Sequence, residues 1–284
     1  MKRHPYPFTT GVYQGYVLYD FAHTHSAQEL GVDLDLEELE QVAHEYAFEL
    51  DAIPVGYSNL LLQAGDQIIL VDAGIRRPVG ELHFGLAELG IDPGDIQTIV
   101  LTHSDRDHVG GILDEDGGLS FPNARYVILE DSWRRWSTRE SRDELGKLNN
   151  WTADKVQFVW ETYARIEEQI LAVQSGEEFI PGLRLLAAPG HRYDHSILTV
   201  TSGEDQLVHL SDAVVHPLFM AHREWYSTYD ADPAQAVKTK IELLDMCAAE
   251  NAMVFGAHFP FPGLGHVRSG QEGWTWELVA APYA

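Results

Sequence analysis

IVLTHSDRDHVGG, residues 99–111, is the stretch that decides the fold of this chain. The apolar run ends at Leu101, and four residues able to bind a metal ion follow it closely: His103, Asp105, Asp107 and His108. In an extended segment, side chains two and four positions apart point the same way, so the first three should converge on one side. The fourth begins the next turn and can face a second ion. Imidazole and carboxylate ligands together suit zinc, manganese or iron. The alternative is a polar, solvated loop that matches a metal motif by chance.

The composition is that of a globular protein with a strongly acidic surface. The 284 residues are 45% hydrophobic and carry a formal net charge of -25, which disfavours binding to nucleic acid or to an anionic membrane. Cys247 is the one cysteine, so an intrachain disulfide and a thiolate zinc finger are excluded. No apolar run reaches the length of a membrane span, and the first residues do not resemble a secretory signal. We therefore expect a soluble cytoplasmic protein.

Apolar segments and helical patterns alternate along the chain. We predict strands where short apolar runs are bounded by turn residues, and helices where apolar residues recur at helical spacing. The predicted strands are residues 55–62, 67–71, 97–101, 125–129, 183–187, 197–201, 207–210 and 253–255. The predicted helices are residues 33–50, 79–89, 152–173 and 232–250, and the tryptophan-rich residues 131–151 are expected to be irregular. This alternation favours packed layers with helices outside and two sheets inside.

The chain is expected to form one domain over residues 1–284, because no linker or low-complexity tract divides it. Residues 1–50 would be an N-terminal extension whose amphipathic helix packs on that domain. Residues 11–21 alternate in the manner of a strand. His23 and His25, which follow, have the spacing of the metal motif but no neighbouring carboxylate pair or Gly-Gly, so we interpret them as loop residues near a substrate entrance.

A recurrence strengthens the interpretation as a metal site, because predicted strands repeatedly end beside a residue that can bind metal. Such strand ends carry Asp72, His103, His191, Asp212 and His258. Active-site groups commonly lie on loops at one edge of a rigid core. With the other motif residues, these side chains provide enough ligands for two ions, and Asp212 is able to bridge them. Two ions about 3.5–4 Å apart can polarise a carbonyl or phosphoryl oxygen and hold a hydroxide between them.

These motifs resemble those of the metallo-β-lactamase superfamily. Residues 103–108 resemble HxHxDH, PGHRYDH at residues 189–195 resembles PGHTxGH, Ser211-Asp212 resembles the bridging aspartate and Gly256-Ala257-His258 the last ligand. The stretches FPNARYV, DADPAQA and GAHFPFPGLGHV are similar to the branch that contains methyl parathion hydrolase and its esterase-like and lactonase-like relatives. The resemblance implies an α/β fold, the αββα four-layer sandwich, and a metal-bridging hydroxide as nucleophile.

The resemblance also implies a role for each motif residue. His103 and His191 would hold the first ion, Asp107, His108 and His258 the second, and Asp212 would bridge the two. Asp72 and His195 would orient ligand imidazoles without binding metal, a support that metal sites generally need. Asp107 would in addition act in catalysis, by accepting the proton of the nucleophile and passing it to the leaving group.

Asp105 departs from the family motif, which has a histidine at that position. A carboxylate is harder than imidazole and shorter in reach, so the two divalent ions implied by the family, expected to be zinc, become manganese or iron as an alternative. Asp105 would either bind the first ion or leave that site weak. Flavodiiron oxygen reductases and competence-type DNA-uptake nucleases also have a carboxylate there. Neither fits, since the chain has no flavodoxin-like extension and its surface is acidic.

Four further residues are candidates for the lining of a substrate pocket: Trp133, Trp136, His216 and Phe259. For the tryptophans the alternative is ordinary core packing, and for His216, four residues beyond Asp212, it is loop structure. Apolar side chains are the usual lining of a small-molecule pocket.

The function predicted from these residues is the hydrolysis of a small-molecule ester or lactone by a dinuclear metal-dependent enzyme. The alternatives are a phosphotriesterase and a metal-poor, non-catalytic member of the fold that binds a ligand, which Asp105 leaves open. A redox diiron protein is a further alternative. Neither nucleic acid nor membrane is expected as a partner, and a homodimer remains one open oligomeric state.

Overall fold

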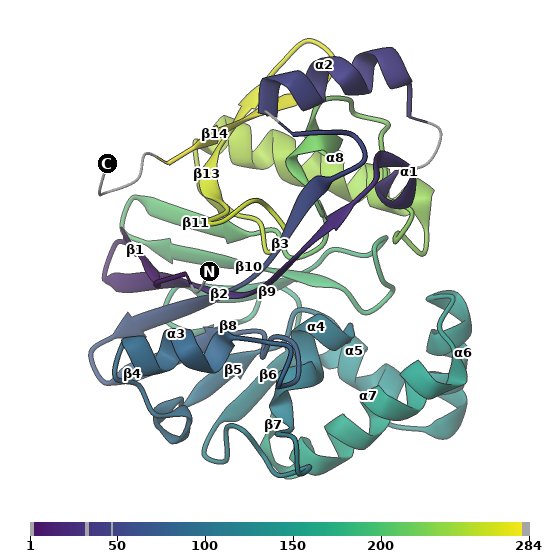
Figure 1. Ribbon diagram of the computed structural model, residues 1–284. Helices are drawn as coiled ribbons and strands as arrows, with labels where there is room; N and C mark the ends of the chain where they lie inside the picture. Colours follow the sequence, from purple (N-terminus) through teal and green to yellow (C-terminus); the bar gives the residue numbers. More distant parts are fainter. Residues whose placement is uncertain (1–2, 32–33, 47, 280–284) are drawn as a thin grey trace.

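The structure, a computed structural model, describes residues 3–31, 34–46 and 48–279. Two seven-stranded sheets stack at the centre of the molecule, and helices cover the outer face of each (Figure 1). The chain builds the first sheet and its helices before it enters the second, so the N-terminal and C-terminal halves of the chain form opposite sides of the molecule. The first strands and α1 and α2 extend across to the second side.

The first sheet follows the order of the chain from β1 to β7. Its first strands are antiparallel, and β4 to β7 are parallel to one another. The strands are β1 (Tyr6–Thr10), β2 (Tyr13–His25), β3 (Ile53–Ala64), β4 (Gln67–Val71), β5 (Thr98–Val100), β6 (Arg125–Leu129) and β7 (Ile170–Val173).

The second sheet has the order β14-β13-β12-β11-β10-β9-β8, in which β11 and β12 are a parallel pair. The strands are β8 (Glu178–Ile180), β9 (Leu183–Ala187), β10 (Ser196–Ser202), β11 (Asp205–His209), β12 (Met253–Phe255), β13 (Leu264–Ser269) and β14 (Trp274–Leu278).

The helices lie mainly between consecutive strands. The α-helices are α1 (Ala27–Leu30), α2 (Leu36–Tyr46), α3 (Leu82–Glu88), α4 (Arg106–Val109), α5 (Glu130–Trp136), α6 (Arg139–Leu148), α7 (Ala153–Ile166) and α8 (Pro233–Glu250). Short 3-10 helices occur at η1 (Pro93–Asp95), η2 (Gly110–Ile112), η3 (Glu167–Gln169) and η4 (Pro217–Met220).

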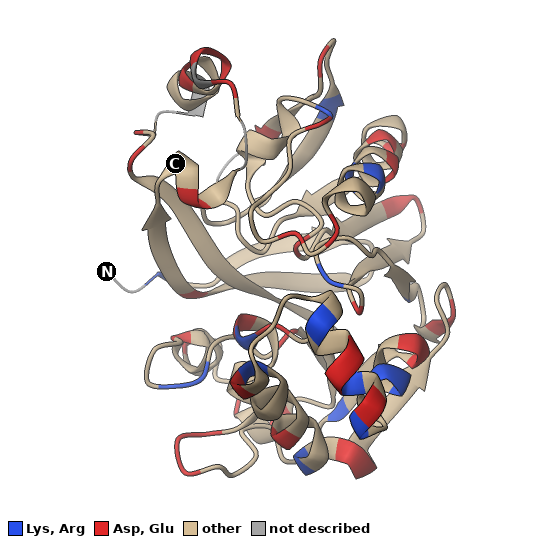
Figure 2. Ribbon diagram, turned by 90° about the vertical axis from the view of Figure 1, so that its right-hand side faces the viewer, with Lys and Arg blue, Asp and Glu red and all other residues tan. Residues whose placement is uncertain are grey.

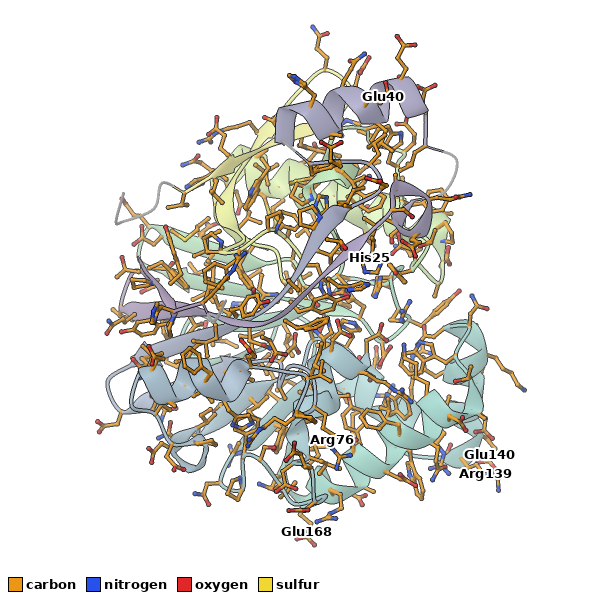
Figure 3. The ribbon with its side chains drawn as sticks, in the orientation of Figure 1. His25, Glu40, Arg76, Arg139, Glu140 and Glu168 are labelled. Atoms are coloured by element: carbon orange, nitrogen blue, oxygen red, sulfur yellow. The ribbon has the colours of Figure 1, made fainter. Side chains whose placement is uncertain are left out.

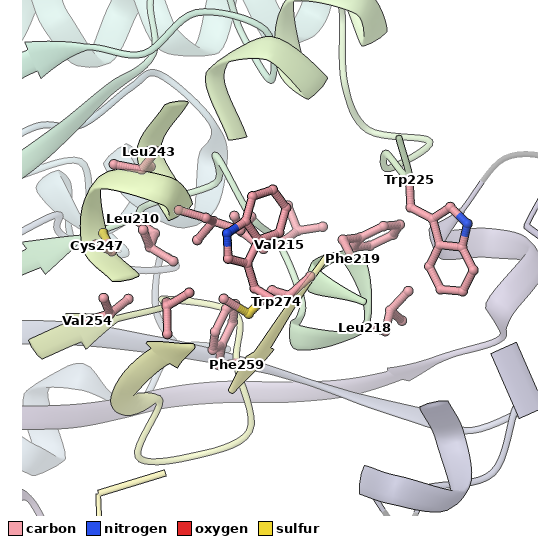
Figure 4. Close-up of a cluster of buried hydrophobic side chains, with 14 of the residues drawn as sticks. Leu210, Val215, Leu218, Phe219, Trp225, Leu243, Cys247, Val254, Phe259 and Trp274 are labelled. Atoms are coloured by element: carbon pink, nitrogen blue, oxygen red, sulfur yellow. The ribbon is translucent and has the colours of Figure 1, made fainter. Parts of the chain in front are cut away.

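Three separate clusters of buried apolar side chains mark the contacts between four layers. Alternation along β3 shows the arrangement: Leu60 and Leu62 lie in the cluster between the two sheets, whereas Leu61 lies in the cluster beneath the helices of the first side. The third cluster joins the second sheet to α8 and η4, and includes Leu210, Phe219 and other side chains that Figure 4 shows. The layers therefore run helix, sheet, sheet, helix, which confirms the predicted αββα sandwich.

Most predicted strands occur where the sequence pattern placed them. The strands at residues 67–71, 125–129 and 183–187 match β4, β6 and β9 residue for residue, and the helix expected to start after Asp232 is α8. The Asp232 side chain accepts a hydrogen bond from the backbone N–H of Gln235 at 3.1 Å, and Pro233 stands at the first helical position. The predicted helix 33–50 is shorter in the structure, as α2, and residues 33 and 47 lie outside the described residues.

Three element predictions are wrong. Residues 131–151 are not irregular but form α5 and α6, where Thr138 caps α6 by accepting the N–H of Ser141 at 3.1 Å. The helix predicted over residues 152–173 ends at Ile166, and its last four residues form β7, which pairs with β6. His23 and His25 lie on the end of β2 rather than on a loop.

The described ranges contain no helix long and apolar enough to cross a membrane. Acidic side chains occur on the helices of both sides, and lysine and arginine alternate with them on the helices of the first side (Figure 2).

Candidate metal centre

Loops that follow strands of both sheets meet at one edge of the sandwich. Asp72 directly follows β4, and His103 follows β5; Asp212 lies just beyond β11, and His258 beyond β12. The carboxyl ends of parallel strands point to the same edge of a sheet, and the stacked sheets bring their two edges together. Short helix α4 then begins at Arg106, which places Asp107 and His108 on its first turn beside the strand ends.

Asp107, His108, Asp212 and His258 lie close enough together to hold one metal ion. We call this group the second position, after the second ion of the sequence prediction. The imidazole Nε2 of His108 lies 3.4 Å from Asp107 Oδ2 and 3.2 Å from Asp212 Oδ1. The Nε2 atom of His258 lies 3.4 Å from Asp107 Oδ2 and 3.1 Å from Asp212 Oδ2. Ligand atoms of one ion bound at about 2.1 Å stand at such separations from one another.

His103, Asp105 and His191 form another such group, which we call the first position. Asp105 Oδ2 lies 3.9 Å from His103 Nε2 and 3.6 Å from His191 Nε2. Asp212 Oδ2 lies 3.8 Å and 3.3 Å from the same two nitrogens. Asp212 is therefore within ligand distance of both groups, which is the placement that a bridging carboxylate needs.

The donor atoms fit metal binding because they face one another and four of them make no hydrogen bond. The buried side-chain atoms without a hydrogen-bond partner in the described part of the chain include His103 Nε2, His108 Nε2, His191 Nε2 and Asp212 Oδ1. A buried polar atom without a partner is costly in a folded protein, and bound cations remove that cost. The residues present therefore match a divalent metal centre of nitrogen and oxygen ligands.

The other nitrogen of each ligand imidazole is held from outside the centre. Asp72 Oδ2 lies 2.8 Å from His108 Nδ1, and the same carboxylate accepts the backbone N–H and the hydroxyl of Thr102 at 2.8 Å each. The carbonyl oxygen of Gly56 lies 3.0 Å from His258 Nδ1, and Asp230 Oδ1 lies 3.2 Å from His191 Nδ1. Such contacts fix which ring nitrogen faces the metal.

His195 lies against the centre but is not free to bind a metal. Its Nδ1 lies 2.8 Å from the carbonyl oxygen of Ala188, and its Nε2 accepts the backbone N–H of Asp212 at 3.0 Å. Burial and the neighbouring His191 lower its pKa to about 3, so the ring stays neutral, as an acceptor at Nε2 must be. His195 thus fixes the backbone of Asp212.

Charges in the centre are strongly coupled. Burial opposes the charged form of every member, yet Asp212 and Asp107 raise the pKa of His258 to about 9. The imidazoles of His258, His108 and His103 in turn hold the pKa of Asp212 well below its ordinary value. The carboxylates thus attract positive charge strongly, either protons on the imidazoles or metal ions between them.

A cavity of about 370 Å³ opens onto the centre. Asp107, Asp212, His191 and His258 lie at its base, and its walls are mainly apolar or aromatic: Phe21, His25, Leu30, Val55, Tyr57, Ile75, Val215 and Tyr229. Figure 3 labels His25, at the end of β2, near the level where the two sides of the molecule meet. The strands β2 and β3 and the loop after β11 therefore form the cavity together.

The four residues predicted to line the pocket lie elsewhere. Trp136 is buried in the cluster beneath α5 to α7, where its indole N–H donates to Ser104 Oγ at 3.1 Å, and Trp133 packs against that cluster. Phe259 lies in the cluster of the second side (Figure 4). His216 is buried and its Nδ1 accepts the N–H of Leu218 at 3.2 Å, at the start of η4. Packing therefore accounts for the three aromatic side chains, and capping of η4 for the Nδ1 atom of His216.

Several residues around the centre did not emerge from the sequence. Lys155 and Arg192 form ion pairs with Asp105, Asp230 supports His191, and Tyr57 lines the cavity. Arg192 alone had a visible signal, because it replaces the threonine of the motif PGHTxGH in a chain where Asp105 replaces a motif histidine. Asp105 and Arg192 both depart from the family motifs, which indicates that the two side chains contact each other.

Comparison with known proteins found a matching family model and several similar proteins. The family model described as the metallo-beta-lactamase superfamily matches residues 53–258. A Mycobacterium tuberculosis protein named "Probable metallo-hydrolase Rv2300c" is 24% identical, over 71% of this chain and 74% of that protein.

Among solved structures, the chain is similar to AidC, described as a dizinc quorum-quenching lactonase in complex with a product. The TM-score is 0.88 and the identity 22%, over 98% of each chain. It is also similar to AbOPH, described as a hydrolase in the beta-lactamase superfamily, with a TM-score of 0.87 and 24% identity over 97% of each chain. At these identities the likeness concerns the fold.

Proposed function

This chain belongs to the metallo-beta-lactamase superfamily, and on that premise we propose that it is a dinuclear metal-dependent hydrolase that cleaves a small-molecule ester or lactone. A metal-dependent hydrolase follows from the family. The dinuclear centre, the substrate class and the predicted branch of esterase-like and lactonase-like enzymes belong to the proposal. The proposal also includes two expectations on partners. The protein binds neither nucleic acid nor membranes, and a homodimer is one open oligomeric state.

One observation carries the proposal: unpaired ligand atoms from both sheets face one another in a cavity whose walls are mainly apolar or aromatic. His108 Nε2 and His191 Nε2 are both buried without a hydrogen-bond partner, and Asp212 lies within 3.3 Å of each. An uncharged ester or lactone with an apolar portion matches walls formed by Phe21, Leu30 and similar side chains.

Two divalent ions, when bound, supply Lewis acidity, which lowers the pKa of a water molecule and polarises the substrate carbonyl. His103, Asp105 and His191 would hold one, and Asp107, His108 and His258 the other, with Asp212 shared. Zinc is expected from the family. Manganese or iron is the alternative that the carboxylate of Asp105 favours.

Asp107 is the candidate for proton transfer. Its side chain keeps 22% of its surface exposed, more than the other members of the second position, and it lines the cavity. One of its oxygens can therefore accept a proton from the attacking water and return it to the leaving alkoxide. The imidazoles of His108 and His258 keep its pKa below the ordinary value despite burial, so it begins the reaction as a base.

Tyr57 is placed to bind the substrate. Its ring packs edge-on against His258, with ring centres 4.7 Å apart, and it lines the cavity beside Asp107. Burial and the nearby Asp107 raise the pKa of its hydroxyl above the ordinary value of 10, so it remains a hydrogen-bond donor at neutral pH. A phenol in this place can orient a substrate oxygen over the ligands.

The reaction adds one water molecule across the acyl C–O bond, which breaks and leaves a carboxylate, a hydroxyl group and one released proton. Hydrolysis of aryl esters and lactones by the purified, metal-loaded protein, followed through that proton, tests the proposal. We expect turnover by the wild type and a large loss in the His108→Ala variant.

Three results would contradict the proposal. Equal turnover by wild type and His108→Ala would show that the activity does not use this centre. A faster reaction with a phosphotriester than with any lactone would favour a phosphotriesterase. No turnover with fewer than one metal ion per chain would favour a ligand-binding member of the fold.

A further inference from the structure

Asp105 differs from its neighbours in the centre, because its carboxylate already has partners. Arg192 donates to it from Nε at 3.0 Å and from Nη2 at 2.7 Å, and Lys155 Nζ lies 2.9 Å from its Oδ1. The facing atoms of His103, His108 and His191, by contrast, have no hydrogen-bond partner. The first position therefore contains a ligand candidate that two protein cations already neutralise.

Both cations are held in place by further contacts. Arg192 is 7% exposed, and its Nη1 donates to the carbonyl oxygens of His191, at 2.7 Å, and of Tyr229. Lys155 Nζ lies 4.3 Å from the centre of the Trp151 ring, a favourable cation-π distance. The cluster of Asp105, Arg192 and Lys155 thus has a net charge of +1 in a fixed geometry next to the first position.

The second position has the opposite balance of charge around its carboxylate. Asp107 forms ion pairs with His108 and His258, and no lysine or arginine pairs with it among the described residues. A metal ion there would experience the full negative charge of Asp107. The negative charge of Asp212 acts on both positions equally. At the same time Asp72 makes the His108 imidazole a stronger donor by accepting its Nδ1 proton.

We propose that Arg192 and Lys155 make the two metal positions unequal, so that an ion at Asp107, His108 and His258 is held more tightly than an ion at His103, Asp105 and His191. This inference rests on the dinuclear centre of the proposed function. Its cause is electrostatic: a divalent ion at the first position is repelled by two fixed cations in a poorly solvated site, and competes with them for one carboxylate.

Removal of zinc from the loaded full-length protein tests this without any measurement of activity. The protein is dialysed against rising concentrations of a chelator, and zinc retained per chain is measured. We expect two losses separated by at least about tenfold in chelator concentration. In Lys155→Met, which keeps the apolar contact with Trp151, the first loss moves about tenfold toward the second. Lys238→Met, an exposed lysine of α8, is the control and leaves both losses unchanged.

Two further variants assign the losses to the positions. His191→Ala should remove the early loss and His258→Ala the late one, and circular dichroism confirms that each variant is folded. A single loss of both ions from the wild type, an early loss assigned to His258, or an early loss that Lys155→Met and Lys155→Gln leave unmoved would each overturn the inference. Unequal zinc binding without hydrolysis of any ester or lactone would refute the proposed function alone.

Discussion

The two metal positions share an edge of the sandwich and one carboxylate, but the chain supports them differently. The second position is backed by Asp72, whose oxygen lies 2.8 Å from His108 Nδ1, and no protein cation pairs with its own carboxylate in the described residues. The first position is backed by Asp230 at 3.2 Å, and its Asp105 is paired with Arg192 and Lys155.

The identity of the ligands does not by itself determine the electrostatic environment of a bound metal ion. Both positions contain two imidazoles and a carboxylate of their own, so their ligand lists are alike. The side chains that contact these ligands differ in charge. Asp72 adds negative charge beside His108, whereas Arg192 adds positive charge beside Asp105.

Asp212→Ala removes the one ligand that both positions share, so it should weaken metal binding at both. We expect zinc affinity to fall at least about 100-fold at both, beyond the range for loss of a partner outside the ligand shell. Zinc retained per chain under chelator competition measures this. Asp143→Ala, at an exposed site on α6, is the matched control. Wild-type affinity at either position would show that Asp212 does not bridge.

Asp72→Asn and Asp230→Asn each weaken the support of one ligand imidazole, so they affect one position at a time. Asp72→Asn should lower zinc affinity at the second position about 10–100-fold. Asp230→Asn should lower that of the first position by less, because its contact with His191 Nδ1 is longer, at 3.2 Å against 2.8 Å. The same chelator assay separates the positions, with thermal melting as the check on folding. Equal losses from the two variants would show that Asp230 supports its imidazole as strongly as Asp72 does, despite the longer contact.

The smallest expected effect concerns Asp20, which holds the segment after Asp72 by accepting the N–H groups of Ile75, at 2.6 Å, and Leu82, at 2.9 Å. Burial raises its pKa from 3.8 to about 6, although those hydrogen bonds lower it. The folded chain therefore keeps a proton that the unfolded chain releases. Its contribution to stability is greatest below pH 3.8, falls as the pH rises to 6 and is constant above.

Asp20→Asn mimics the protonated carboxyl and should remove this dependence. Between pH 4 and pH 7 we expect the free energy of unfolding of wild type to fall by about 2 kcal/mol relative to the variant. Urea unfolding at several pH values measures the difference. A difference that grows in the other direction would mean that the folded protein holds Asp20 ionised.

Local sequence signals predicted the elements whose boundaries depend on local chemistry. β4 and α8 were correct because a turn, an N-cap and a proline fix their ends within a few residues. The prediction for residues 131–151 was wrong because charged residues hid two helices, of which α5 packs Trp133 and Trp136 inward. The end of the helix predicted over residues 152–173 was wrong because only pairing with β6 makes the last segment a strand.

By itself the sequence determined the layered α/β fold and the ligand candidates, since hydrophobic periodicity and closely spaced histidines and aspartates are properties of short stretches. Only the tertiary structure decided which charges surround those candidates. Lys155 lies 50 positions from Asp105, and nothing in its local pattern indicates that the two meet. Arg192 lies 87 positions away, and its only sequence signal is a departure from its own motif. Coulombic interaction depends on distance in space, which the packing of α7 and of the loop after β9 sets here.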